Sequence, residues 1–282
     1  MYRVILESCP SIEDVNRAYY DAVSCCYDAK HGISSADMGW FIEDVTRLLG
    51  EMPVGVRVLD CGAGTGRCAI KFAKAGNEVL AVDISGGILD TCRKNASREG
   101  VHVSTLEADC CRIPLPSGTF DVVVFCAALH HIQNVKLALA EASRLLRPGG
   151  RLLLMAEPKV SLIRPAWMRR VKDRLSDEYD RSVCGQVKLE ANPDVHIFVV
   201  RELQSLLEAL GFGSIRVWPF FCLTSIYRDL VYYRIRNNRV RSTLYWWLYW
   251  FDRRTLGFLP SACKALFHLA AVKEGARKCG DV

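Results

Sequence analysis

The stretch from Asp60 to Gly66, "DCGAGTG", carries three glycines spaced two apart directly after a short apolar run. Glycine adopts positive φ readily and lets a ligand approach the main chain closely. A glycine loop between a strand and a helix N-terminus therefore presents backbone N–H groups to a polar or anionic ligand. The spacing G-x-G-x-G differs from the G-x-G-x-x-G of dinucleotide-binding loops. Asp60 would repel a pyrophosphate, but it suits a ligand that carries a positive ammonium group.

Two further carboxylates follow apolar runs of the same kind. Asp83 ends "VLAVD", where a carboxylate can accept hydrogen bonds from both hydroxyl groups of a ribose. Asp109 ends "LEAD", where it is placed to accept from an adenine amino group. Each motif alone is weak evidence, and only their joint occurrence is specific.

These residues lie where strands and helices are expected to meet. From 54 to 157, apolar runs alternate with helical segments, which predicts right-handed βαβ units on a parallel sheet. We expect strands at "VRVLDCG", "EVLAVDI", "VHVSTLEAD", "FDVVVFCA" and "RLLLMAE". Ser11 and Asp14 have capping-box spacing, so a helix is expected to begin there, and a second helix is expected over about 36–50. After 157 we expect a helix at "RELQSLLEALG" and strands at "SIRVWPFF" and "ALFHLAAV".

The series of motifs resembles the class I S-adenosylmethionine-dependent methyltransferases, in the methyltransferase type 11 group that includes the ubiquinone/menaquinone C-methyltransferases. The resemblance is carried by "DCGAGTG", "VLAVDIS", "LEADC", "FDVVVFCAALHHI" and "LLRPGG". It covers residues 54–157 closely and 200–218 loosely. It implies an α/β fold: a Rossmann-like, doubly wound, mostly parallel seven-stranded sheet with an N-terminal helical cover and a C-terminal helical insertion before the last strand. The last strand of the family is antiparallel to the others, and "ALFHLAAV" is the candidate for it.

The resemblance implies that the cofactor is S-adenosylmethionine and that the glycine loop holds its methionine end. The residues carried over to this role are Asp60, Gly62, Ala63, Gly64 and Gly66. The loop from Cys126 to Ala128 would supply a carbonyl group to the cofactor's amino group.

The nucleoside end of the cofactor is assigned by the same resemblance. Asp83 would bind the ribose, and Ile84 would lie against the adenine ring. Asp109 and the backbone of Cys110 would bind the adenine edge. The segment "AYYDAVSCCYDAKHG" is similar to the helix that covers the cofactor in this group, so Tyr27, or else Tyr19 or Tyr20, is expected to contact it. Packing of these rings on a helix face is the alternative.

Methyl transfer from a sulfonium is a single in-line displacement, so the protein chiefly positions two reactants. A general base is needed only where the nucleophile is a hydroxyl group or an acidic carbon. His130 and His131 follow the fourth expected strand, at the rim of the cofactor site, and one of them is expected to face the substrate. Glu157, at the end of the fifth strand, is a second candidate, with a solvated strand end as the alternative.

The segment 226–254 is dense in aromatic residues and arginines and has three interpretations. It is a packed helical insertion or substrate lid, a helix that contacts the membrane surface, or an RNA-binding surface, in that order of preference. The membrane interpretation places at the headgroups the rings of Tyr245, Trp246, Trp247, Tyr249, Trp250 and Phe251. The arginines that would meet anionic lipid are Arg236, Arg239, Arg241, Arg253 and Arg254.

The composition is that of a globular protein, with 282 residues of which 50% are hydrophobic and 24% charged. A net charge of +6 permits an anionic partner without requiring one. The 13 cysteines include no C-x-x-C motif, which disfavours a zinc site and favours a reducing cytoplasm. No apolar run approaches the roughly 20 residues that span a bilayer. We therefore expect no metal and a cytoplasmic protein, with peripheral membrane contact through 226–254 as the alternative location.

Three regions are expected: an N-terminal cover (1–53), a core that binds S-adenosylmethionine (54–157), and a substrate-side region (158–282) with an insertion over about 223–262. The predicted activity is methyl transfer to a small, apolar or lipid-linked molecule, and nucleic acid is not the expected partner. The alternatives are a tRNA-modifying methyltransferase and a non-catalytic cofactor- or lipid-binding accessory subunit. The presence of Asp60, Asp83, Asp109 and the three loop glycines argues against a catalytically inactive site.

Overall fold

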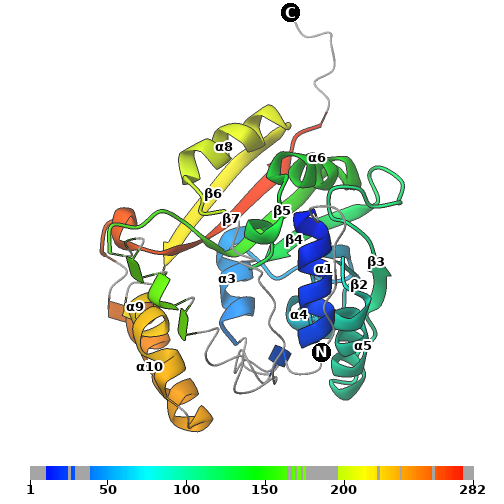
Figure 1. Ribbon diagram of the computed structural model, residues 1–282. Coiled ribbons are helices and arrows are strands. Elements are labelled where there is room, and N and C mark those ends of the chain that lie inside the picture. The colour runs from blue at the N-terminus through cyan, green and yellow to red at the C-terminus, as the bar shows by residue number, and fades with distance from the viewer. Residues whose placement is uncertain are drawn as a thin grey trace, which may run out of the picture.

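A seven-stranded sheet forms the centre of the computed structural model, in the order β3-β2-β1-β4-β5-β7-β6 (Figure 1). The structure describes residues 11–24, 27–28, 39–163, 165, 167–168, 170–172, 174–175, 196–220, 223–235, 237–255 and 258–275. The strands are β1 (Arg57–Cys61), β2 (Glu78–Asp83), β3 (Ser104–Glu107), β4 (Phe120–Cys126), β5 (Leu146–Pro158), β6 (Phe212–Phe220) and β7 (Leu266–Lys273). Only β7 is antiparallel to its neighbours, β5 and β6. The expected fold and the antiparallel last strand are confirmed.

Helices cover both faces of the sheet. On one face lie α3 (Gly39–Leu49), α4 (Arg67–Lys74) and α5 (Gly86–Arg98). Their buried side chains, such as Phe41 and Phe72, share a core with Val58 of β1. On the other face, α6 (Val135–Leu145) and α8 (Val200–Ala209) pack against a core that contains Leu59. The sheet is therefore doubly wound, as expected.

The first described helix, α1 (Ile12–Val23), begins where the sequence predicts. Ser11 is its N-cap, and the Ser11 hydroxyl oxygen accepts a hydrogen bond from the Asp14 backbone N–H at 3.1 Å. The helix α3 ends at Leu49, before Gly50, whose φ of +91° ends a helix at little cost. The first residues of the second expected helix, 36–38, lie outside the described residues.

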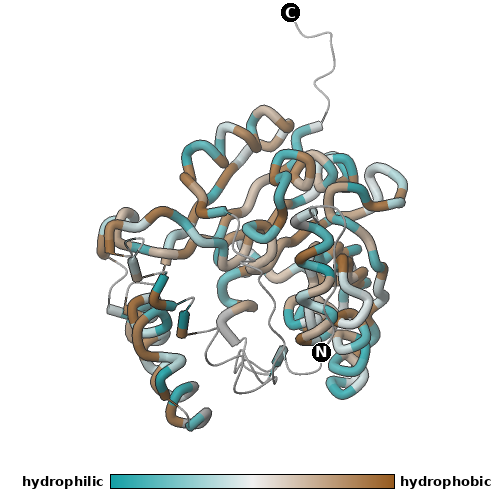
Figure 2. Tube along the Cα trace, in the orientation of Figure 1, coloured by the Kyte–Doolittle hydropathy of each residue, from teal (hydrophilic) through white to brown (hydrophobic). Residues whose placement is uncertain are grey.

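A helical insertion separates β6 from β7, at the lower left of Figure 1. It consists of α9 (Leu223–Leu230), the 3₁₀ helix η3 (Tyr232–Arg234), α10 (Asn238–Thr255) and the 3₁₀ helix η4 (Ser261–Cys263). Figure 2 shows hydrophobic residues along the central strands and again along α9 and α10. Within the described ranges, no helix is both long and apolar enough to cross a membrane.

Candidate active site

The glycine loop follows the carboxyl end of β1, and its three glycines have different surroundings. A Cβ on Gly62 would lie 2.7 Å from the Cβ of Ala128, and one on Gly66 would collide with the Cys92 sulfur. A Cβ on Gly64 would meet nothing within 4 Å, although its φ of +54° strains any other residue. Gly62 and Gly66 thus let the loop pack against its neighbours, whereas Gly64 faces open space where a ligand can approach the main chain.

Asp60 precedes the loop and is fully buried. Its Oδ2 accepts a hydrogen bond from the Ala69 N–H in α4 at 2.9 Å, and its Oδ1 has no hydrogen-bond partner among the described residues. Burial raises the pKa of Asp60 to about 7. A cationic group bound at this loop would favour the charged carboxylate, so Asp60 fits a ligand with an ammonium group.

We expect S-adenosylmethionine binding to release a proton from Asp60. Because burial raises the pKa of Asp60 from the ordinary 3.8 to about 7, the ligand-free protein still binds a proton there around neutral pH. The ligand's ammonium group favours the ionised form, so affinity should rise as the pH rises towards about 7. Calorimetry in buffers of different ionisation enthalpy measures the release. Asp60→Asn should abolish it, and equal release by both proteins would contradict this role.

Asp83 ends β2 beside the same loop and is almost fully buried. Its Oδ2 accepts from the Gly64 N–H at 2.9 Å, and its Oδ1 accepts from the Ser85 N–H at 3.1 Å. Burial raises the pKa of Asp83. Each carboxylate oxygen can accept a second hydrogen bond, so a ribose hydroxyl still finds an acceptor here. Ile84, half-buried, follows directly.

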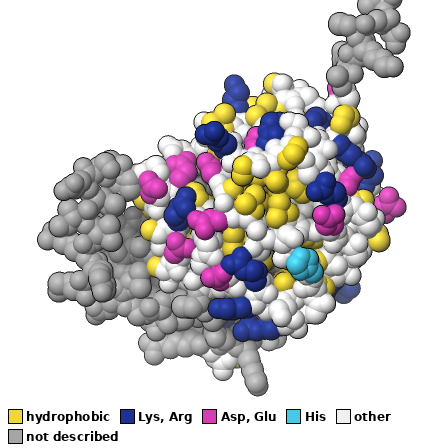
Figure 3. Space-filling model, turned by 90° about the vertical axis from the view of Figure 1, so that its right-hand side faces the viewer, with side chains coloured by type: hydrophobic (Ala, Val, Ile, Leu, Met, Phe, Trp, Pro, Cys, Tyr) yellow, Lys and Arg dark blue, Asp and Glu magenta, His cyan; other side chains and the backbone are white. Residues whose placement is uncertain are grey.

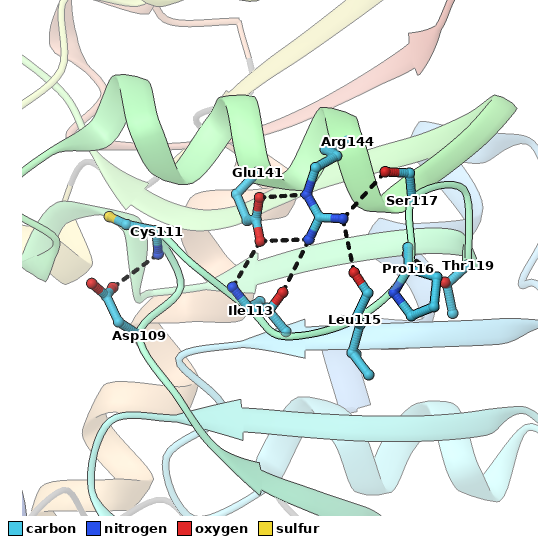
Figure 4. Close-up of polar contacts among 9 residues, drawn as sticks. All are labelled: Asp109, Cys111, Ile113, Leu115, Pro116, Ser117, Thr119, Glu141 and Arg144. Atoms are coloured by element: carbon cyan, nitrogen blue, oxygen red, sulfur yellow. Dashed lines mark hydrogen bonds and ion pairs between the residues drawn. The ribbon is translucent and has the colours of Figure 1, made fainter.

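The turn after β3 carries Asp109 and Cys110, and α6 holds the segment that follows this turn (Figure 4). Asp109 Oδ1 accepts from the Cys111 N–H at 2.8 Å, and Cys110 is buried. Beyond the turn, Glu141 Oε1 accepts from the Ile113 N–H at 2.7 Å. Arg144 donates to the Ile113 and Leu115 carbonyl oxygens at 3.0 and 2.8 Å.

Glu141 and Arg144 also pair with each other, and this pairing lowers the pKa of Glu141. The pair therefore fixes the segment that presents Asp109. It was not identified from the sequence, because a Glu and an Arg three residues apart on a helix give no sign that they bind a distant loop.

The helix α1 lies across the loops at the carboxyl ends of the strands. Asp21 accepts from the Gly87 N–H at 3.1 Å, at the start of α5, and Asp28 accepts from the Thr65 hydroxyl at 2.7 Å, in the glycine loop. The Asn16 side chain donates to the His131 carbonyl oxygen at 2.9 Å. These polar contacts hold this N-terminal segment against the loops of the candidate site. From the sequence, only its tyrosines were named individually, as expected contacts of the cofactor.

The tyrosines of the cover form a ring cluster. The ring of Tyr27, half-buried, lies 6.0 Å from that of Tyr20, which lies 5.2 Å from that of Tyr19. Tyr20 also makes an edge contact with His131 at 6.1 Å. These tyrosines therefore pack against one another and also lie close to the candidate site.

The turn after β4 carries His130 and is held by Glu157. Glu157 is fully buried, so the alternative of a solvated strand end is wrong. Its Oε1 accepts from the Ala128 and Leu129 N–H groups, both at 3.0 Å. Its Oε2 accepts from the His130 N–H at 3.2 Å and lies 2.8 Å from His130 Nδ1. With both oxygens occupied, Glu157 is better suited to orient His130 than to take a proton from a substrate.

Other residues of this turn lie close by. Cys126, half-buried, ends β4, and the next residue, Ala127, has a φ of +52° and is exposed. The His131 ring, half-buried, lies 3.9 Å from that of His130. His196, to which the sequence assigned no role, donates its backbone N–H to the His130 carbonyl oxygen at 3.1 Å. The structure thus brings His130, His131 and Glu157 together, and the backbone of His196 contacts the same turn.

Two observations bear on metal and nucleic-acid binding by the described residues. No three described His, Cys, Asp or Glu side chains are grouped so that they could hold a metal ion. On the face in Figure 3, Lys and Arg lie among Asp and Glu around a hydrophobic area. The described part of that face therefore has mixed charge rather than one continuous basic strip.

Comparison with known proteins gives three kinds of match. A family model described as a methyltransferase domain matches residues 59–154. The chain is 30% identical over 206 residues to a demethylmenaquinone methyltransferase of Clavibacter sepedonicus, covering 70% of this chain and 82% of the relative. It is 32% identical over 216 residues to a ubiquinone/menaquinone biosynthesis C-methyltransferase of Teredinibacter turnerae, covering 71% of this chain and 84% of the relative.

Solved structures share the fold at lower identity. A phosphoethanolamine N-methyltransferase of Haemonchus contortus, in complex with S-adenosylhomocysteine, matches with a TM-score of 0.64 and 20% identity over 95% of this chain and 61% of that chain. The cyclase SpnF matches with a TM-score of 0.60 and 17% identity over 95% of this chain and 98% of that chain. Since these two proteins differ in the chemistry their names give, the fold alone does not identify the reaction.

Proposed function

The chain belongs to the class I S-adenosylmethionine-dependent methyltransferases, and we propose that it methylates a carbon atom of an apolar, quinone-type small molecule. Its cofactor is S-adenosylmethionine. The substrate class is supported by the relatives, which are named for demethylmenaquinone and for ubiquinone/menaquinone biosynthesis. These names do not favour the tRNA-modifying enzyme or the accessory subunit.

We assign the methionine end of the cofactor to Asp60 and to the loop around Gly64, with Gly62, Ala63 and Gly66 shaping the loop. This is supported by the buried carboxylate of Asp60 and by the open space at Gly64. The nucleoside end is assigned to Asp83, Ile84, Asp109 and the backbone of Cys110, and the turn at Cys126 and the cover residue Tyr27 complete the proposed set. In this assignment 1–53 is the cover, 54–157 the cofactor-binding core and 158–282 the substrate-side region.

The contact between Glu157 Oε2 and His130 Nδ1 at 2.8 Å carries the proposed mechanism. Glu157 already accepts three backbone N–H groups, so we expect it to accept from His130 as well. Nδ1 then carries the proton, and Nε2 carries the lone pair of a base. When bound, S-adenosylmethionine supplies an electrophilic methyl group. His130 would take the proton of a hydroquinone hydroxyl, which makes the neighbouring ring carbon a better nucleophile.

His130→Gln is expected to lower kcat by about 10²- to 10⁴-fold, because the amide cannot act as a base. The affinity for S-adenosylhomocysteine, measured by calorimetry, should stay within about twofold, since the proposed cofactor residues are untouched. His131→Gln is the matched control in the same turn and should cost less than about tenfold. A His130→Gln enzyme with the wild-type kcat would remove His130 from the mechanism.

We further propose that the substrate is lipid-linked and that α10 contacts the membrane surface. Val240, Leu244, Trp247 and Phe251 recur at helical spacing and are exposed. Trp247 is 61% exposed, and its ring stacks on that of Phe251 at 5.5 Å. We call these four residues the aromatic stripe, after the rings of Trp247 and Phe251. Insertion of such a stripe into the headgroup region is favourable because it removes apolar surface from water. On the surface of a protein in water, the same apolar area stays exposed.

The structure corrects part of the sequence-based membrane interpretation. Tyr249 is buried and Trp246 half-buried, with ring centroids 5.3 Å apart, so these rings belong to the core of the insertion. Arg241 is fully buried, and Arg253 forms an ion pair with Asp44 at 2.6 Å. Arg254 is exposed and remains available to anionic lipid. Arg236 and the side chain of Arg239 lie outside the described residues.

A further inference from the structure

We propose that His268 and Asp44 are positioning residues: they hold a bulge in β5 that aims Glu157 at His130. This inference rests on the proposed role of His130 as the base. Asp44 lies in α3 and His268 in β7, and neither residue was given a role from the sequence.

The bulge lies between two regular pairs of the β5–β7 ladder. Leu154 pairs with Leu269, and Glu157 pairs with Phe267, so Met155 and Ala156 together face the single residue His268. Ala156 has a φ of +57°, in the left-handed region. An extra residue in one strand shifts every later side chain to the opposite face of the sheet.

The shift decides where Glu157 points. Before the bulge, Leu152 and Leu154 face the core under α6 and α8, whereas Leu153 and Met155 face the other core. Regular alternation would send Glu157 to the face of Leu153. After the bulge, Glu157 is paired with Phe267, which belongs to the core that also contains Ala128 and Leu129. The carboxylate therefore reaches the turn that carries His130.

His268 accepts a hydrogen bond from a backbone N–H group in the bulge. The Ala156 N–H donates to His268 Nδ1 at 3.0 Å instead of to the backbone of β7. Since Nδ1 accepts, Nε2 carries the proton and donates to Asp44 Oδ2 at 3.0 Å. Both side chains are fully buried, and burial lowers the pKa of His268, in agreement with a neutral ring.

The ring of His268 is fixed from other sides as well. The Phe220 ring stacks on it with centroids 4.1 Å apart and an interplanar angle of 16°. Arg253 of α10 donates to Asp44 Oδ1 at 2.6 Å and so holds the carboxylate that orients the imidazole. Without the acceptor on His268, the part-buried Ala156 N–H would lose its partner, and the bulge would lose the contact that stabilises it.

Two substitutions at His268 separate positioning from packing. Asparagine can keep an acceptor near the position of Nδ1, whereas leucine fills similar space and offers none. In two-bond ¹H–¹⁵N spectra, assigned with the His130→Gln protein, wild-type His130 should show the Nδ1–H tautomer. His268→Asn should keep that tautomer and most of kcat. His268→Leu should show a tautomer mixture and at least a tenfold lower kcat, with S-adenosylhomocysteine affinity within about twofold.

The proposal is overturned if folded His268→Leu protein keeps both the tautomer and kcat, or if the asparagine variant is as impaired as the leucine variant. If His268→Leu does not fold, Asp44→Leu carries the test, because leucine fills a similar volume and leaves the His268 Nε2–H without its acceptor. An unchanged His130 spectrum in folded Asp44→Leu protein would then contradict the proposal. The spectra need no turnover, so they remain informative even if His130 proves not to be the base.

Discussion

Valine in place of Gly64 is expected to weaken S-adenosylmethionine binding by more than about 100-fold, or ~2.7 kcal/mol, from a wild-type affinity in the micromolar range. The open space beside Gly64 is where we place the methionine end of the cofactor, and the isopropyl group would fill it. Calorimetric titration measures the loss, and circular dichroism shows whether the fold is retained.

The control for this substitution is Gly100→Val. Gly100 follows α5 and has a φ of +69°, and a Cβ at this position, like one on Gly64, would meet nothing within 4 Å. Both valines therefore carry a similar left-handed backbone cost, about 1–2 kcal/mol of folding free energy. Only Gly64→Val should lose the cofactor. Equal loss in the two variants, or full binding by Gly64→Val, would contradict the assignment of the loop.

Serine at both Trp247 and Phe251 is expected to reduce binding to anionic vesicles at least tenfold, or ~1.4 kcal/mol, without changing the melting temperature. The two rings form the centre of the aromatic stripe and are exposed in water, so the fold gains little from them. Co-sedimentation with vesicles of phosphatidylglycerol and phosphatidylcholine measures the effect. Added salt should weaken wild-type binding, because it screens arginines such as Arg254.

Trp246→Ser is the contrasting change on the same helix. The ring of Trp246 is half-buried and contacts those of Tyr245 and Tyr249. Its loss should destabilise the protein by about 2–3 kcal/mol rather than act on lipid binding alone. Wild-type protein that does not sediment with anionic vesicles at low salt would contradict the membrane contact and leave the stripe to another partner.

The sheet and the glycine loop were predictable because their signals are local. Apolar runs that end in Asp60 and Asp83 mark strands, and a run of glycines marks the turn into a helix. The capping spacing at Ser11 likewise involves neighbours in the chain. The antiparallel last strand was expected only because of the family resemblance, since no local pattern gives strand direction.

The parts that could not be predicted depend on contacts between distant residues. Asp44 and His268 are 224 positions apart, and nothing near either of them indicates the other. The bulge at Ala156 follows the uniformly apolar run "LLLM", in which a shift of one residue leaves no trace in the hydrophobic pattern. For this reason Glu157 could be taken for a solvated strand end.

For a similar reason, the sequence does not indicate which face of α10 is buried. In "LYWWLYWF" both the buried and the exposed sides are apolar, so periodicity does not separate Trp246 from Trp247. Only the packing of the insertion distinguishes the buried Tyr249 from the exposed aromatic stripe.

Methylation of a ring carbon of a quinone-type molecule can be read from the mass of the product. The purified chain would be incubated with S-adenosylmethionine that carries a trideuterated methyl group and with a demethylated hydroquinone in vesicles, under reducing conditions. We predict a product with one trideuteromethyl group on a ring carbon, and none with the Gly64→Val protein. No labelled quinone, or label found on a hydroxyl oxygen or on added tRNA instead, would contradict the account.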